Sequence, residues 1–386
     1  MAEQFATLVS LTIDGKGSYG IGASAVPFSK DLYAYLRISD IRDDGTLNLQ
    51  DLKSVDDEKA SEYLLKQNDI VFARTGSNTG RNYFYDGTDG EFVYAGFLIK
   101  FSLDEKKVNP KYIKYFCQSK QYKDWINSFN TGSTRGNINA QILGKMPIPI
   151  IERKKQDILV SVLSSIDKKI RNNNEINNNL EKQAQTIFKS WFIDFEAFSN
   201  RKPSDWSVST LGNVSIMGAG GDKPQNVSQI KTDLYEYPIY SNGLSNEGLY
   251  GFTDKPKISE ESVTVSARGT IGFVCLRHIP YVPIVRLVTL IPKTEIISAK
   301  YLYLWLKQLH ITGTGTTQQQ LTVPDFQKTE ILVPSQEIVT LFTTTVDPIF
   351  EKIWANQNEN EKLSSLRDTL LPKLMSGELD VSNIDL

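Results

Sequence analysis

The chain of 386 residues nearly repeats itself at an offset of 183 residues, and the clearest copy is a pair of heptad series. Apolar residues alternate in steps of four and three, which is the spacing of a coiled-coil seam. The first series is Leu159, Leu163, Ile166, Ile170, Asn173, Asn177, Leu180, Ala184, Ile187 and Trp191. Its copy, 183 residues later, is Phe342, Val346, Ile349, Ile353, Asn356, Asn360, Leu363, Arg367, Leu370 and Leu374.

Both series carry asparagine at the same two seam positions. Chance apolar periodicity rarely reproduces a polar interruption in register, and a seam asparagine sets register and partner choice at a cost in stability. The repeat therefore predicts two copies of one unit, each ending in a long helix. About 41 residues of helix span roughly 60 Å.

Composition places the chain among soluble two-domain proteins, with 40% hydrophobic and 23% charged residues. No apolar run approaches the roughly 20 residues of a membrane span, and residues 1–10 have no secretory-signal pattern, so we expect a cytoplasmic protein without membrane contact. We expect Cys117 and Cys275 to be buried, reduced thiols. The net charge of −2 argues weakly against nucleic acid, but residues 335–386 alone carry 9 acidic and 4 basic side chains, so the rest of the chain is net positive.

The two halves predict the same order of elements. In the first half, we expect strands at 33–38 and 69–73, a helix over 111–129, a polar loop over 130–139, an edge strand at 146–150 and a long helix from Glu152. In the second half, we expect a strand and glycine-rich turn at 206–221, strands at 262–267 and 272–276, a helix over 300–309, a polar loop over 312–322, an exit at 331–334 and a long helix from Ile338.

The register of the repeat holds through the polar loop, the exit and the helix, and it drifts upstream. There we pair Tyr112 with Tyr301 and Arg74 with Arg268. The chain before Tyr33 does not match residues 206–221 closely, so the boundaries are least certain there.

No catalytic pattern survives inspection. A phosphate-binding GxxxxGK[ST] loop is absent from the sequence. The run from Asn109 to Tyr112, Asn-Pro-Lys-Tyr, departs from the methyltransferase Asn/Asp-Pro-Pro-Tyr motif and is better explained as a helix start. Asp325 with Glu330 lacks the lysine of a nuclease motif, and His278 and His310 are isolated.

Two polar segments in each half are candidates for DNA recognition. Arginine, asparagine and glutamine match the edges of guanine and adenine, while serine and threonine suit phosphates. For any single residue a solvated turn is at least as good an explanation, but the equivalence of the loops favours function. The candidates are Arg74, Thr75, Ser77, Asn78, Arg81, Ser133, Thr134, Arg135 and Asn137 in the first half, and Arg268, Thr270, Thr316, Thr317, Gln318, Gln319 and Gln320 in the second.

The chain resembles, over essentially its whole length, the specificity subunit of Type I restriction–modification systems. Residues 180–195, LEKQAQTIFKSWFIDF, are similar to the central conserved region of that family. Residues 366–379, LRDTLLPKLMSGEL, are similar to its C-terminal conserved region. The polar loops are similar to the target-recognition pattern of the family, which is too divergent to identify a base sequence.

The resemblance implies an α+β fold, in which two α/β target-recognition domains are separated by two long antiparallel coiled-coil helices with a pseudo-twofold internal repeat. It implies recognition domains at 1–150 and 199–334 and spacer helices at 151–198 and 335–386. Each domain would read half of a bipartite double-stranded DNA site, and the helices would fix the spacing. Two methylation subunits would dock and methylate adenine at N6, and restriction subunits would join them.

The chain itself would then be non-catalytic and hold no metal or cofactor, since S-adenosylmethionine, ATP and magnesium are expected on the partner subunits. Two alternatives stay open. One is a self-contained restriction or methylation enzyme, against which the missing adenosylmethionine loop speaks. The other is a coiled-coil scaffold that binds only proteins.

Overall fold

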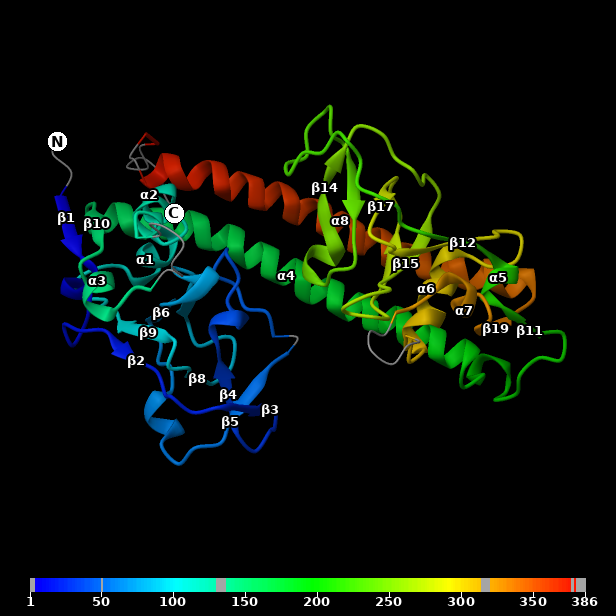
Figure 1. Cartoon of the computed structure of the whole chain (residues 1–386), viewed down its shortest axis with the longest axis horizontal. Helices are drawn as coiled ribbons and strands as arrows, with labels where there is room; N and C mark the ends of the chain where they lie inside the picture. The colour runs from blue at the N-terminus through cyan, green and yellow to red at the C-terminus, as the bar shows by residue number, and fades with distance from the viewer. Residues whose placement is uncertain (1–3, 50, 130–136, 314–319, 376–377, 380–386) are drawn as a thin grey trace. The chain divides into compact units, whose positions relative to one another are not determined.

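A computed structural model describes residues 4–49, 51–129, 137–313, 320–375 and 378–379 of the chain (Figure 1). The chain forms two compact units, of which unit 1 comprises Met1–Asn172 and Glu359–Leu386 and unit 2 comprises Asn173–Asn358. Each unit holds one α/β domain and a part of both long helices. The expected α+β organisation, with two α/β domains and two long antiparallel helices, is confirmed.

The described residues of the domain of unit 1 form three sheets. An antiparallel sheet has the order β2-β9-β6-β7, a mixed sheet has the order β3-β5-β4-β8, and β1 pairs with β10. The strands are β1 Gln4–Thr7, β2 Ser18–Tyr19, β3 Ala25–Pro27, β4 Tyr33–Leu36, β5 Lys53–Val55, β6 Asp69–Ala73, β7 Asn82–Tyr85, β8 Phe92–Tyr94, β9 Leu98–Ser102 and β10 Pro147–Ile150. The helices are α1 Pro110–Phe116, α2 Lys120–Asn127 and α3 Ala140–Gly144.

The domain of unit 2 repeats this plan. Its antiparallel sheet has the order β12-β18-β15-β16, a second sheet has the order β14-β13-β17, and β11 pairs with β19. The strands are β11 Ser207–Thr210, β12 Ser215–Ala219, β13 Tyr237–Tyr240, β14 Leu249–Thr253, β15 Ser262–Val265, β16 Val274–Arg277, β17 Val282–Pro283, β18 Val288–Pro292 and β19 Glu330–Val333. The helices are α5 Leu211–Val214, α6 Ala299–Gln308 and α7 Val323–Phe326.

The start of the chain matches the sequence around residues 207–215 poorly, as expected, but it takes the equivalent place in the fold. Strand β1 pairs with β10 as β11 pairs with β19, and each first strand leads into a short helical turn. Leu8 and Leu11 are buried in that turn in unit 1, and Leu211 and Val214 are buried in unit 2. Thr7 and Leu8 match Thr210 and Leu211, but a match this short does not show the equivalence by sequence alone.

The helix expected over 111–129 is two helices. Asn109 caps α1, since its side chain accepts a hydrogen bond from the amide of Lys111, and Pro110 follows at the first turn. This confirms the helix start at the Asn-Pro-Lys-Tyr run. The chain then leaves the helix after Cys117, and the hydroxyl of Ser119 accepts a hydrogen bond from the amide of Tyr122 to begin α2. A serine that can cap a new helix explains the break.

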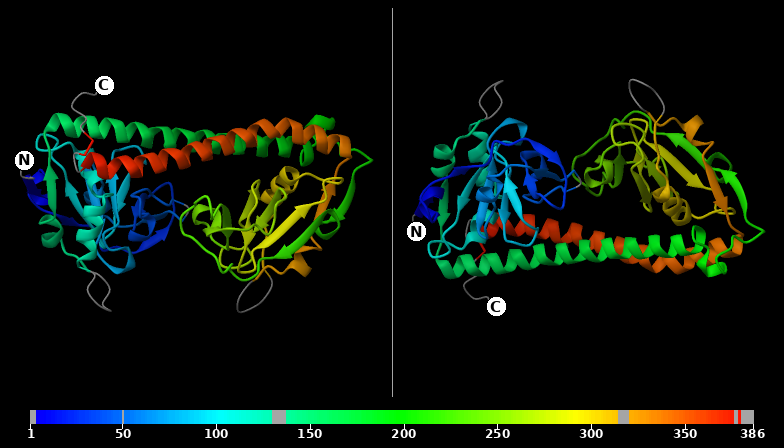
Figure 2. Two further views of the ribbon diagram at one scale, coloured as in Figure 1. Left: turned by 90° about the horizontal axis from the view of Figure 1, so that it is seen from above. Right: turned by 90° about the horizontal axis from the view of Figure 1, so that it is seen from below.

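The long helices α4, Arg153–Phe192, and α8, Gln336–Met375, have 40 residues each and run antiparallel. They lie side by side in both views of Figure 2. In unit 1 the guanidinium of Arg367 lies 3.4 Å from the carboxylate of Asp167. In unit 2 the side-chain amide nitrogen of Asn356 donates a hydrogen bond of 2.8 Å to the side-chain carbonyl oxygen of Asn177.

All seam positions of the two series are buried or half-buried. The seam asparagines Asn173 and Asn356 are each only 1% exposed. Further large side chains outside the series, such as Phe188 and Phe350, are also buried, because each helix faces a domain as well as its partner helix. No helix in the described ranges is long and apolar enough to cross a membrane.

Each domain shares one core with the helix pair. In unit 1, Leu159 and Leu163 from α4 and Leu371 from α8 join the core of the antiparallel sheet and α1. In unit 2 the roles of the helices are exchanged, as Phe342 from α8 and Phe188 from α4 join the equivalent core.

A tyrosine in each unit fixes the strand that leads into the long helix. The hydroxyl of Tyr112 donates a hydrogen bond of 2.7 Å to the carbonyl of Pro149. The hydroxyl of Tyr301 donates a bond of the same length to the carbonyl of Leu332. The pairing of the two tyrosines, expected from the sequence, is thus confirmed at the level of contacts.

Replacing the seam asparagine by Asn356→Ala is expected to lower the stability of the helix pair, since it removes the donor to Asn177 and leaves a void. The expected loss is about 1–2 kcal/mol relative to the matched variant Asn178→Ala, which alters an exposed residue of α4. Both changes raise helix propensity equally, so the difference isolates the contact. Urea unfolding followed by circular dichroism measures it, and equal midpoints would contradict a role for this bond.

Candidate nucleic-acid interface

A glycine-rich turn leaves the central strand of the main sheet in both units. The amide of Gly80 bonds to the carbonyl of Ala73 after β6, and the amide of Gly272 bonds to the carbonyl of Ser266 after β15. Both glycines have a positive φ, +89° and +85°. A Cβ at Gly80 would overlap the side chain of Ile126, so this turn also needs glycine for close packing.

The polar loop returns to the same strand end in each unit. The amide of Ile138 donates to the carbonyl of Arg74 at 2.9 Å, and the amide of Leu321 donates to the carbonyl of Ala267 at 3.0 Å. Arg74 is therefore equivalent to Ala267. The sequence pairing of Arg74 with Arg268 is wrong by one residue, because backbone hydrogen bonds, and not the shared residue type, define the position.

The two polar segments adjoin as a result. Thr75 forms an antiparallel bridge with Asn137 in unit 1. At the equivalent place in unit 2, the guanidinium of Arg268 donates a hydrogen bond of 3.0 Å to the side-chain carbonyl of Gln320. The structure thus brings candidates from segments 62 residues apart in unit 1 and 52 residues apart in unit 2 onto one strand end, with the same backbone and different side chains.

Some candidates have structural partners. The Nε of Arg81 lies 2.6 Å from the carboxylate of Asp43, and its Nη1 donates to the carbonyl of Ile41. The side-chain amide of Asn78 donates to the carbonyl of Ile38 at 3.4 Å. These bonds tie the turn to residues 38–43 and favour a positioning role for both side chains.

Other candidates differ in exposure and in the bonds of their side chains. Ser77 is exposed, and the hydroxyl of Thr270 is buried without a hydrogen-bond partner. The guanidinium of Arg74 lies 5.1 Å from the ring centre of Tyr19, and its Nε has no hydrogen-bond acceptor.

The remaining candidates cannot be placed. Those in the central parts of the two polar loops lie outside the described residues, and these are Ser133, Thr134, Arg135, Thr316, Thr317, Gln318 and Gln319.

Asn242, which the sequence did not single out, organises the strand end of unit 2. Its side-chain carbonyl accepts the amide of Ala267 at 2.7 Å, and its side-chain amide donates to the carbonyl of Val285 at 2.6 Å. In unit 1 one backbone bond makes the equivalent link, from the amide of Arg74 to the carbonyl of Phe97. Nothing in the local sequence around Asn242 signals this bridge, since its partners lie 25 and 43 residues away.

A buried arginine anchors the segment that carries Asn242. Arg277 is 3% exposed and donates to the hydroxyl of Thr264, and to both the carboxylate and the carbonyl of Glu247. Its guanidinium carbon lies 3.6 Å from the ring centre of Tyr240. Each of the three guanidinium nitrogens donates one hydrogen bond within unit 2, which favours a structural role for this arginine.

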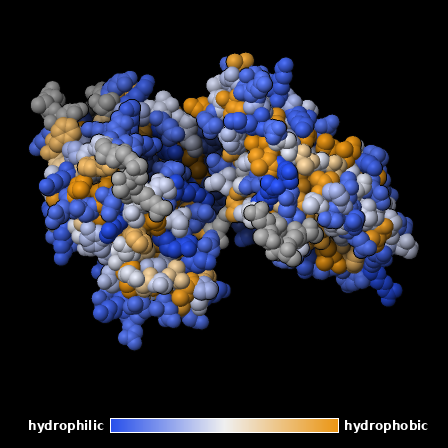
Figure 3. Space-filling model, in the orientation of Figure 1, coloured by the Kyte–Doolittle hydropathy of each residue, from blue (hydrophilic) through white to orange (hydrophobic). Residues whose placement is uncertain are grey.

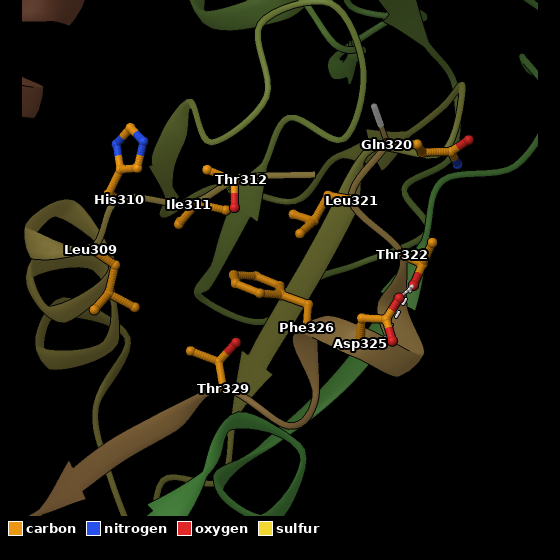
Figure 4. Close-up of a pocket in the computed structure, with 10 residues that line it drawn as sticks. All are labelled: Leu309, His310, Ile311, Thr312, Gln320, Leu321, Thr322, Asp325, Phe326 and Thr329. Atoms are coloured by element: carbon orange, nitrogen blue, oxygen red, sulfur yellow. Dashed lines mark hydrogen bonds between the residues drawn. The ribbon is translucent and has the colours of Figure 1, made fainter. Parts of the chain in front are cut away.

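A cavity of about 250 Å³ lies beside the polar loop of unit 2. Figure 4 shows its lining, in which Phe326 and Leu321 face inward and the ring of His310 points away from them. The hydroxyl of Thr322 donates a hydrogen bond of 2.7 Å to the carboxylate of Asp325. This bond belongs to the cap of helix α7, so Asp325 has a structural role at the start of the suspected nuclease pattern.

The titratable groups offer no evident nucleophile or metal cluster in the described part of the chain. No group of three or more His, Cys, Asp or Glu side chains there could hold a metal ion. Burial raises the pKa of the Cys275 thiol to about 12 and raises that of Cys117 well above its usual value. Both thiols are buried and unpaired, as expected.

Two equivalent domains on antiparallel helices, each with polar segments joined at one strand end, define a duplicated recognition protein. The family model for the Type I restriction modification DNA specificity domain matches residues 28–182 and 203–364. The chain therefore belongs to the family of Type I restriction–modification specificity subunits, which are non-catalytic components of their systems.

Named specificity subunits match most of the chain, and a solved structure shares its fold. The chain is 27% identical to the Type I restriction enzyme MjaIX specificity subunit of Methanocaldococcus jannaschii, over 72% of this chain and 71% of the relative. It is 24% identical to the HindI specificity subunit of Haemophilus influenzae, over 82% and 87%. The crystal structure of a Type I S subunit from M. genitalium superimposes with a TM-score of 0.56 at 19% identity, covering 97% and 96%, which supports the fold.

Removing the bridge by Asn242→Ala is expected to loosen the strand end of unit 2, because the buried Ala267 amide loses its acceptor. Hydrogen exchange followed by mass spectrometry should show faster exchange in peptides covering 266–270 and 283–287. The control Asn226→Ala removes an exposed amide that bonds Asp254, and it should leave those peptides unchanged. Unchanged exchange in Asn242→Ala would contradict the bridging role.

Proposed function

We propose that the chain is the DNA-reading subunit of a Type I restriction–modification complex, and that each unit reads one half of a bipartite double-stranded site. The observation that carries this proposal is the pair of equivalent strand ends. The same backbone bonds present Thr75 and Asn137 in unit 1, and Arg268 and Gln320 in unit 2. Side chains that differ on a common backbone suit two readers of unlike base sequences.

The helix pair is proposed to set the distance between the two half-sites. Helices α4 and α8 continue without a break through the boundary between the units, at about 60 Å each. Their seam, with buried asparagine, fixes one register between the helices. One turn of duplex is about 34 Å, so helices of this length suit half-sites in separate stretches of groove.

The partners follow from the internal repeat. Each unit combines the start of one helix with the end of the other, so equivalent surfaces occur twice and suit two copies of one methylation subunit. We propose that these subunits carry S-adenosylmethionine and methylate adenine at N6. Restriction subunits, with ATP and magnesium, would complete the nuclease. The recognition domains would span 1–150 and 199–334, and the spacer helices 151–198 and 335–386.

Exchanging residues 199–334 for the same region of a relative is expected to change one half of the methylated sequence and to leave the other half unchanged. The exchange replaces the strand end of unit 2 and keeps both helices. Methylation mapping of a host genome that expresses the chain with its methylation subunit measures the result. A change in both halves would contradict modular reading.

Footprinting of the wild-type complex on the mapped site separates the alternatives. Protection of two separate stretches supports a bipartite reader. One continuous stretch, or none, would contradict it, and no protection at all would favour a scaffold that binds only proteins. Binding of labelled S-adenosylmethionine to the chain alone would instead favour a self-contained enzyme.

Inserting one heptad at matching points of α4 and α8 is expected to lengthen the unread gap by about three base pairs, because seven residues add roughly 10 Å. The seam stays in phase, so both half-sites should be retained. A five-residue insertion serves as the control, since it rotates the seam and should destabilise the helix pair. Methylation mapping reads the gap directly, and an unchanged gap with the heptad variant would refute the spacer role.

A further inference from the structure

Two chain segments cross unusually closely beside the strand end of each unit. The amide of Gly20 donates to the carbonyl of Leu98 at 3.2 Å, and the amide of Gly220 donates to the carbonyl of Leu287 at 2.8 Å. A Cβ at Gly20 would overlap the carbonyl of Tyr94, and a Cβ at Gly220 would overlap the backbone of Ile284. The crossing therefore requires glycine in both units, and it fixes the residue just before each glycine.

Those preceding residues differ between the units. In unit 1 it is Tyr19, at the end of β2, with 42% of its surface exposed. In unit 2 it is Ala219, at the end of β12. A common backbone thus presents an aromatic side chain in one unit and a methyl group in the other.

The crossing partner in each unit is a tight turn with an exposed tip. The amide of Leu98 bonds to the carbonyl of Ala95, and the amide of Leu287 bonds to the carbonyl of Ile284. Exposed apolar residues are scattered over the visible surface (Figure 3), and Phe97, at the tip of the turn in unit 1, is 59% exposed. The equivalent tip residue in unit 2 is Arg286.

The turn of unit 2 adopts a demanding backbone. Val285 and Arg286 have φ values of +52° and +61°, in the left-handed region that branched residues rarely adopt. The bond from Asn242 to the carbonyl of Val285 holds this conformation at 2.6 Å. A strained turn that is held in place beside the candidate recognition surface favours a role in binding over a simple link between two strands.

Arg74 links the turn, the crossing and the polar strand end of unit 1. Its amide donates to the carbonyl of Phe97 at 3.1 Å, and its guanidinium lies over the ring of Tyr19. Arg81 has a carboxylate partner, whereas Arg74 has no ion pair and its buried Nε no acceptor among the residues that the structure describes. A half-buried guanidinium that stacks on a ring and has no ion pair within that part of the chain suits an external acceptor.

We propose that Tyr19, Arg74 and Phe97 form one base-reading cluster in unit 1, in which Arg74 hydrogen-bonds a guanine and Phe97 contacts the adjoining base pair. The equivalent positions of unit 2 hold Ala219, Ala267 and Arg286. This inference rests on the proposed function, and it adds both the residues and the base.

The chemistry of each side chain supports its role. The guanidinium fork matches O6 and N7 of guanine, which is the commonest specific contact in the major groove. Tyr19 limits the orientations of Arg74 by stacking beneath it. The exposed ring of Phe97 can contact a thymine methyl group or enter a base step. In unit 2 the arginine stands at the turn tip instead, so the two units would place their arginines at different points of their half-sites.

The test uses the chain in complex with its methylation subunits. Arg74→Gln is expected to reduce discrimination at one G·C pair of one half-site by about 10- to 100-fold, with the other half-site unchanged. Arg74→Lys keeps the charge without the fork, so it should retain overall DNA affinity and lose the same discrimination. Arg286→Gln should affect only the opposite half-site. Competition binding to single-substitution DNA sites and methylation mapping provide the readouts.

The controls distinguish three causes of a negative result, which are a folding defect, a wrong base-reading cluster and a wrong proposed function. Lys59→Gln removes an exposed charge of unit 1 outside the cluster and should leave discrimination unchanged. Phe97→Ala removes an exposed side chain, so it tests the cluster even where a change at Arg74 lowers the melting temperature. If wild type reads a bipartite site and the variants at 74 and 97 keep its full discrimination, the cluster is refuted. If wild type protects no bipartite site, the proposed function itself fails.

Discussion

The packing of each α/β domain against both long helices is the interaction on which the other features depend. In unit 2, the ring centre of Phe192 on α4 lies 4.9 Å from the ring centre of Phe342 on α8. It also lies 4.9 Å from the ring centre of Tyr301 in the domain. Burying a side chain of this size contributes about 1.5–3 kcal/mol. Because one aromatic cluster contacts both helices and the domain, the helix register and the domain position are fixed together. The strand that ends in the polar turn is thereby held in place by the helix pair.

This packing explains which features the two units share. The glycines at the crossing, the tyrosine that bonds the exit strand and the order of the main sheet recur in both units, since each satisfies a backbone or packing requirement. The exposed side chains at equivalent backbone positions differ between the two units. Tyr19 and Ala219 occupy one equivalent position, and Phe97 and Arg286 another. Duplication has kept what holds the domains on the helices, while the exposed side chains have diverged.

The sequence predicted the two long helices and several strands because periodicity and proline act locally, but it merged α1 and α2 into one helix. Strand β6 was expected at its observed bounds. The edge strand expected at 146–150 and the exit expected at 331–334 lie within one residue of β10 and β19. The three-residue strands of the second sheet of unit 1 were beyond prediction, as each is too short to show a pattern. In the candidate site, the sequence found the polar turns but misaligned Arg74 and missed Asn242. Both depend on hydrogen bonds between distant segments, which no local pattern encodes.

The core of unit 1 has a consequence for the way the chain is made. Leu371 and Leu374, which lie close to the C-terminus, pack in the same core as Leu8 and Leu11, which lie close to the N-terminus. During synthesis the first domain emerges long before the end of α8 does, and domains generally begin to fold as they emerge. Part of its apolar surface therefore stays exposed until the end of α8 has been synthesised. Loss of the last turns of α8 would therefore destabilise the domain of unit 1, which is synthesised first.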